Sequence, residues 1–267
     1  MASMLRSASV HLELLLAGHT NLIFSITPSV RATVASERIV FALDGRPVVA
    51  RELSDLHGTR LHTFVSEAGS LSVDYDVQVT DRAALEPIDE RDWITYLRPS
   101  RYAQSDSLTP MARSEFRGLS GYPLVQAITD WVFEHLTYAS GSSHPTDGAL
   151  DTLVSRRGVC RDFAHVTIAL LRALEVPARM VSVYAPGLSP MDFHAVTEAF
   201  VDGAWWVIDS TRLAPRQTLL RIATGRDAAD TAWLTSNWTD LSVTSMQLTV
   251  AADALPFDDH RERVQLG

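Results

Sequence analysis

Lysine is absent from the sequence, and all 23 positively charged side chains are arginine. We interpret this bias mainly as the codon usage of a GC-rich genome. It leaves the chain without any side-chain primary amine. Because 32 acidic residues give a net charge of −9, no basic stripe is available to neutralise phosphates, and we expect no nucleic-acid partner.

Cysteine is almost absent too, because Cys160 is the only one among 267 residues. One cysteine excludes an internal disulfide and a zinc site rich in thiolates, and it fits a reducing compartment. The first apolar stretch is interrupted by His11, Glu13 and His19, so we expect neither a signal peptide nor a membrane span. We therefore expect a cytoplasmic protein with no membrane partner, no metal ion and no other cofactor. The sequence does not specify the oligomeric state.

Apolar and polar residues alternate from about residue 9 to residue 79, which is the period of strands with one buried face. Turn-forming residues such as Asp44-Gly45 separate the runs. This pattern predicts a small antiparallel β-sandwich as an N-terminal domain, residues 1–90. The apolar positions include Val10, Leu12, Leu14, Leu22, Phe24, Ile26, Ile39, Phe41, Leu61, Val65, Leu71, Val73, Tyr75 and Val77.

Beyond residue 90 the alternation stops and turn-forming residues become frequent until Pro123, which predicts a linker over residues 91–122. Residues 123–251 are predicted to form a second, α+β domain, because helical periodicity comes first and strands return after Pro177. The remaining residues, 252–267, are acidic and are predicted to be a flexible tail.

Cys160 lies where one predicted helix ends, at Gly158, and the next begins. In the first turn of a helix, unpaired backbone N–H groups and the positive end of the helix dipole favour a thiolate. Arg157 and Arg161 add positive charge nearby. At this point a buried structural cysteine is the alternative interpretation.

Partners for a reactive cysteine occur on a predicted β-hairpin. Asp202-Gly203, between two alternating runs, is a strong signal for a two-residue turn. That turn sets a register in which Asp209 lies diagonally across from His194 on one face. An imidazole can take the proton of a thiol while a carboxylate orients the ring. The sequence therefore predicts a catalytic site made of Cys160, His194 and Asp209.

Each of these three residues lies in a short motif. The motifs are Gly158-Val159-Cys160-Arg161-Asp162-Phe163-Ala164-His165, Phe193-His194-Ala195 and Trp206-Val207-Ile208-Asp209-Ser210-Thr211. They resemble the motifs of the bacterial transglutaminase-like superfamily, and the N-terminal β region resembles a module that precedes it in one subgroup. The stretch Leu97-Arg98-Pro99-Ser100-Arg101-Tyr102 also matches that subgroup, although Ala103 stands where a cysteine is expected.

The resemblance implies a papain-like core, in which the cysteine helix packs on an antiparallel sheet that carries the histidine and the aspartate. The triad transfers to Cys160, His194 and Asp209 without substitution. We predict cysteine-dependent acyl transfer at an amide of a peptide or protein substrate, through a thioester. The resemblance favours hydrolysis by a protease or amidase.

Three alternatives stay open from the sequence. The first is a protein-glutamine transamidase that cross-links proteins, and the second is a non-catalytic binding module that keeps the fold. The third, acyl transfer from a thioester donor to a small amine, would require a cofactor pocket that the sequence does not locate.

The remaining polar residues of these segments are expected to have structural roles. His165 lies five residues after Cys160, about 140° around the helix, so we expect it to pack rather than to act as the base. Asp162 is expected to cap the helix, and Glu198 to point into solvent. The backbone N–H of Cys160 is the expected first donor to an oxyanion, and the sequence does not identify the second.

Overall fold

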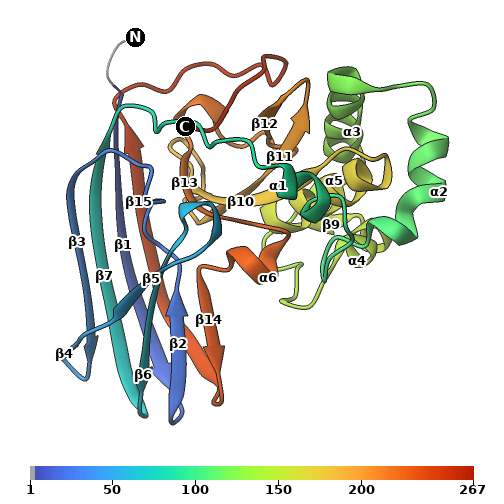
Figure 1. The fold of residues 1–267 in the computed structure, drawn as a ribbon. Coiled ribbons are helices and arrows are strands. Elements are labelled where there is room, and N and C mark those ends of the chain that lie inside the picture. Colours follow the sequence, from blue (N-terminus) through green and yellow to red (C-terminus); the bar gives the residue numbers. More distant parts are fainter. Residues whose placement is uncertain (1–3) are drawn as a thin grey trace.

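Two packed antiparallel sheets form the sandwich in the computed structural model, which describes residues 4–267 (Figure 1). Most of the apolar residues expected to face inward line the inner faces of these sheets. Leu61 and Val65 do not, because His62 and Phe64 occupy the inner face of their strand and Val65 is 49% exposed. The strands are β1 (Leu5–Leu16), β2 (Thr20–Phe24), β3 (Val34–Leu43), β4 (Arg46–Val48), β5 (Arg51–Ser54), β6 (Arg60–Ser66), β7 (Gly69–Thr80), β14 (Leu234–Asn237) and β15 (Leu241–Ala252). One sheet has the order β15-β1-β7-β3-β4 and the other β14-β2-β6-β5. A 3-10 helix, η1 (Leu56–Gly58), precedes β6.

The prediction that residues 123–251 form one domain is wrong at its C-terminal end. β15 pairs with β1 over almost its whole length, and β14 pairs with β2. Both strands therefore belong to the sandwich, which the chain enters a second time. Alternation of apolar residues identifies a strand but does not tell which sheet the strand joins.

The second unit combines helices with a four-stranded antiparallel sheet of order β12-β11-β10-β13, so the predicted α+β class is confirmed. Its elements are α3 (Gly121–His135), β8 (Thr137–Tyr138), α4 (Ala149–Ser155), β9 (Arg157–Gly158), α5 (Cys160–Ala173), β10 (Ala178–Tyr184), β11 (His194–Val201), β12 (Ala204–Ile208), η2 (Arg216–Thr218), β13 (Leu220–Gly225) and α6 (Ala228–Thr231). α5 packs on one face of the sheet and is buried from Asp162 to Ala173.

The segment predicted as a linker, residues 91–122, is instead part of the folded α+β unit. It contains most of α1 (Glu90–Thr95) and all of α2 (Ser105–Glu115). Leu108, Ala112 and Phe116 are buried in the same core as α5. Their spacing of four residues is that of a helix face, and the many turn-forming residues around them concealed it.

The acidic C-terminal segment, predicted to be a flexible tail, is also ordered against the protein. Val264 and Leu266 are buried against the sheet, and the backbone N–H of Val207 donates to the carbonyl oxygen of Val264 at 2.8 Å. Asp258 forms an ion pair with buried Arg216, with Nε and Oδ2 2.8 Å apart. The acidic residues that suggested a solvated tail thus include one that anchors it.

The two units share a hydrophobic core. Tyr184, Leu220 and Ile222 of the four-stranded sheet lie in the same buried cluster as the inner residues of the sandwich, among them Leu12 and Phe24. The sheet that carries the site therefore packs against both α5 and the sandwich. Within residues 4–267, no helix combines the length and the apolar character that crossing a bilayer requires.

Candidate active site

Cys160 is the first residue of α5, and a capping interaction fixes the turn before it. The backbone N–H of Val159 donates to Oδ2 of Asp162 at 2.8 Å, so Asp162 caps the helix as predicted. Gly158 allows this turn, because a Cβ atom there would lie 2.6 Å from Cβ of Asp162. The result is a partly exposed thiol at the positive end of a 14-residue helix.

The hairpin formed by β11 and β12 has the predicted register. Asp202 and Gly203 both have positive φ angles, 53° and 78°, as a two-residue hairpin turn requires. The pairing of Thr197 with Ile208 then brings the residues just beyond it together. Nε2 of His194 lies 2.9 Å from Oδ2 of Asp209, and both side chains are buried.

The environment of this pair favours its charged form. Burial would lower the pKa of His194, but the charge and hydrogen bond of Asp209, together with Cys160, raise it above its usual value. Burial would raise the pKa of Asp209, yet His194 and two hydrogen bonds from Thr211 hold it below its usual value. Asp209 therefore stabilises the protonated ring that forms when His194 accepts a proton, and the hydrogen bonds offset the cost of burying the pair.

Cys160 lies near the same imidazole. Its thiol lies close enough to the ring to contribute to the raised pKa of His194. Its Sγ also lies 3.9 Å from the carbonyl oxygen of Phe193, the residue before His194. Nδ1 of His194 has no hydrogen-bond partner among residues 4–267. The three residues predicted from the sequence are thus brought together, with one ring nitrogen bound to the carboxylate and the other left free.

Tyr138 is a member of the site that the sequence did not indicate. The short parallel bridge between β8 and β9 pairs it with Gly158, and its ring contacts that of Phe163 with centroids 6.0 Å apart. Burial and the charge of Cys160 raise the pKa of Tyr138 to about 12, although a hydrogen bond from the backbone N–H of Cys160 to its hydroxyl oxygen lowers that pKa in part. Tyr138 as a whole residue is 37% exposed, so it forms part of the site's rim.

His165 has the packing role expected of it. It is fully buried, stacks on Tyr102 with ring centroids 5.2 Å apart, and accepts a hydrogen bond from the backbone N–H of Ala228 at 3.2 Å. Burial lowers the pKa of His165 to about 3, so its ring is neutral. It faces away from the thiol and holds α6 against α5.

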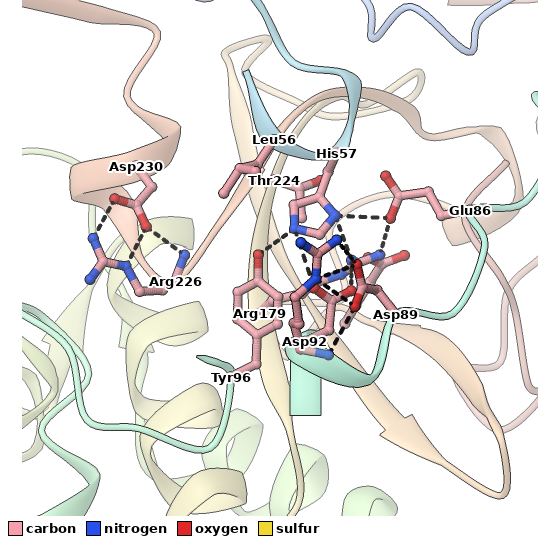
Figure 2. Close-up of polar contacts among 12 residues, drawn as sticks. Leu56, His57, Glu86, Asp89, Asp92, Tyr96, Arg179, Thr224, Arg226 and Asp230 are labelled. Carbon is pink, nitrogen blue, oxygen red and sulfur yellow. Dashed lines mark hydrogen bonds and ion pairs between the residues drawn. The ribbon is translucent and has the colours of Figure 1, made fainter. Parts of the chain in front are cut away.

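Glu198 does not point into solvent, which corrects the expectation from the sequence. Its Oε2 lies 2.7 Å from Nε of Arg179, and its Oε1 lies 2.6 Å from Nη2 of Arg221. Figure 2 shows Arg179 beside His57 of η1 and Glu86, both of which it contacts. The alternation of residues along the strand correctly placed Glu198 on the same face of β11 as His194. It could not reveal that Arg179, Arg221 and the segment around Glu86 cover that face.

Comparison with known proteins adds three findings. A family model described as the transglutaminase-like superfamily matches residues 117–210, a range that contains Cys160, His194 and Asp209. The crystal structure of a protein from Cytophaga hutchinsonii, provisionally named a cysteine protease, superposes with a TM-score of 0.87 at 34% identity. That match covers 97% of this chain and 93% of the other.

Mycobacterial relatives of unknown function are also similar. A protein of Mycobacterium leprae is 31% identical over 139 residues, which is 47% of this chain and 48% of that one. A protein of Mycobacterium tuberculosis is 31% identical over 154 residues, or 51% of this chain and 49% of that one. The matches thus span about half the length of these two relatives.

Proposed function

The chain belongs to the transglutaminase-like superfamily, and we propose that it is a cysteine-dependent enzyme that cleaves an amide of a peptide or protein through a thioester on Cys160. The observation that carries this proposal is the convergence of three groups on one point. The thiol stands at a helix start, and the buried pair of His194 and Asp209 offers it a free ring nitrogen.

The proposed reaction begins when Nδ1 of His194 takes the proton of the thiol. The sulfur attacks the amide carbon, the C–N bond breaks, and the leaving amine takes the proton back from His194. A water molecule, deprotonated by the same ring, then attacks the thioester and releases the acid and the thiol. Asp209 holds the ring by Nε2 throughout and stabilises its charged form. Contacts between base and nucleophile are often loose in a free enzyme and tighten around substrate.

The negative charge on the substrate oxygen needs hydrogen-bond donors in this scheme. The backbone N–H of Cys160 is one donor, since it belongs to the first turn of α5. The hydroxyl of Tyr138 is proposed as the second. With a pKa raised to about 12, this phenol keeps its proton at neutral pH and can donate it to the oxyanion.

Hydrolysis is preferred to cross-linking because of the relative from Cytophaga hutchinsonii. Its provisional name is that of a cysteine protease, and its similarity extends over nearly the whole of both chains. Peptide or protein amides are accordingly the proposed substrates.

The proposal is tested by mass spectrometry of the protein after incubation with a panel of peptide amides and activated esters. We expect an acyl adduct on Cys160 and free acid in solution, both lost in Cys160→Ala. Added primary amine separates the two chemistries, because in a transamidase the amine attacks the thioester in place of water and the product is the amide of that amine, not the free acid. A thiol that reacts neither with the panel nor with iodoacetamide would instead favour a non-catalytic binding module.

A further inference from the structure

β15 forms an open edge of the five-stranded sheet. It is 12 residues long and pairs with β1 on one side. No other strand within residues 4–267 pairs with its opposite side. Every second backbone N–H and C=O group along that side is thus directed away from the sheet, as a template for another strand.

The other sheet edges of the described chain are protected in ways that β15 is not. β4 has three residues and contains Pro47, and β14 has only four residues. β5 carries the charges of Arg51 and Glu52, and the part of β3 that β4 does not reach carries those of Glu37 and Arg38. The edges of the four-stranded sheet are covered, since β12 is bonded by Val264 and β13 by Ser29. Short length, proline, charge and covering all protect an edge, and β15 has none of them, although Thr244 forms a bulge opposite Glu13 and Leu14 of β1.

The composition of β15 suits pairing with an identical strand. Residues 241–252 contain no charged side chain and no proline, in a chain whose net charge is −9. Two copies of this strand can therefore pair along residues 241–252 without placing like charges opposite each other within that range.

Apolar side chains at this edge are incompletely covered. Val243 and Met246 pair with Leu14 and Leu12 of β1, so they lie on the core-facing side of the sheet. They nevertheless remain 43% and 39% exposed, because the second sheet does not extend over the edge. A further strand beside β15 would bury part of this apolar surface and gain hydrophobic stabilisation.

We propose that β15 is a homodimer interface, at which it pairs antiparallel with β15 of a second copy. A two-fold axis near Met246, perpendicular to the sheet, joins the two five-stranded sheets into one. Such an axis keeps the core-facing side on the same face in both copies, so the exposed apolar side chains of the two strands become neighbours. The interface is isologous and closed, as most homodimer interfaces are.

The test measures mass by light scattering coupled to size exclusion, over a series of protein concentrations. The wild-type protein is expected to approach twice its chain mass of 29.4 kDa. The double variant Ser245→Arg with Gln247→Arg places like charges on both strands at the axis, and it should remain a monomer. The matched control is Ser72→Arg with Gln78→Arg, which makes the same two changes on β7, a central strand of the same sheet. This control should dimerise like the wild type.

Hydrogen exchange of the same samples locates the interface. Backbone amides of β15 should exchange more slowly as the wild-type protein dimerises, and this protection should be missing in the β15 variant. A wild-type protein that stays monomeric throughout the series would overturn the proposal. So would a dimer that survives the β15 variant or leaves the amides of β15 unprotected.

Discussion

Oδ2 of Asp209 lies 2.9 Å from Nε2 of His194, while Oδ1 of the same carboxylate accepts two hydrogen bonds from Thr211. Thr211 thus holds the carboxylate by Oδ1, and the carboxylate holds the imidazole by Oδ2. Since Nε2 must then carry the proton of the neutral ring, Nδ1 is the nitrogen free to act as a base. The orientation of the proposed base is therefore a consequence of where Thr211 holds Asp209.

Asp209→Asn should abolish most of the activity without unfolding the protein. If the amide oxygen stays with Thr211, the amide nitrogen faces Nε2 and forces the proton of His194 onto Nδ1. We expect a loss of about 10⁴-fold in kcat, the size seen when a triad loses its orienting carboxylate. The His194 ring, followed by NMR, should also lose the raised pKa that depends on Asp209. Asp192→Asn is the control, because that carboxylate bonds the backbone N–H of Phe193, and it should cost far less. Near-normal turnover in Asp209→Asn would remove Asp209 from the mechanism.

Tyr138→Phe should slow turnover while leaving the nucleophile intact. Removing the proposed oxyanion donor should lower kcat by about 10²-fold, with little change in KM. Alkylation of Cys160 by iodoacetamide generates no oxyanion, so its rate should be unchanged. Tyr102→Phe is a control, since that tyrosine stacks on His165 away from the thiol. Faster turnover in Tyr138→Phe would show instead that the phenol obstructs the site.

The sequence was sufficient for the part of the site that local geometry determines. Asp202-Gly203 fixes the hairpin register, and the register fixes which residues share a face, so the contact between His194 and Asp209 could be predicted. Tyr138 could not, because the bridge between β8 and β9 has two residues per strand and no periodicity to detect. The partner of a two-residue strand is decided by the packing of the elements around it.

The domain boundaries predicted from the sequence were wrong for a related reason. β15 reads as a strand from its sequence, but its partner β1 lies more than 220 residues earlier in the chain. Long-range pairing of this kind leaves no local signature. The helix face of α2 and the anchoring of Asp258 by Arg216 were likewise hidden by residues that usually mark loops.

The pure protein should not cross-link itself, whichever chemistry it performs. Glutamines such as Gln78 and Gln104 could act as acyl donors, but the sequence contains no lysine to act as the acceptor. Prolonged incubation should leave a single chain-length band on denaturing gels. A fluorescent primary amine added in parallel serves as the control, because a transamidase would attach it to glutamine even where self-linkage is impossible. Multimers joined by side-chain isopeptide bonds would contradict this prediction outright.

Glu198 should matter for stability rather than for chemistry. It neutralises Arg179 and Arg221 in the interior, so Glu198→Gln leaves two buried guanidinium groups with less compensation. Breaking a buried ion pair typically costs about 3–5 kcal/mol, and we expect a loss of that size in urea unfolding. Glu175→Gln is the matched control: its carboxylate is exposed and lies 3.9 Å from Arg113, so the change should cost well under about 1 kcal/mol.

The same cluster predicts a pH dependence. Burial would raise the pKa of Glu198, but Arg179 and Arg221 outweigh it and hold the pKa below its usual value. A carboxylate whose pKa is lower in the folded state stabilises the fold above the pKa of the unfolded chain, about 4.3 for glutamate. That contribution is lost as the pH falls through the folded-state pKa. Wild-type stability should therefore fall steeply below about pH 4.3, and Glu198→Gln should show a shallower fall from a lower plateau. Equal acid sensitivity in the two proteins would mean that Glu198 is already protonated in the folded state. The ion cluster would then not link β10, β11 and β13 as its distances indicate.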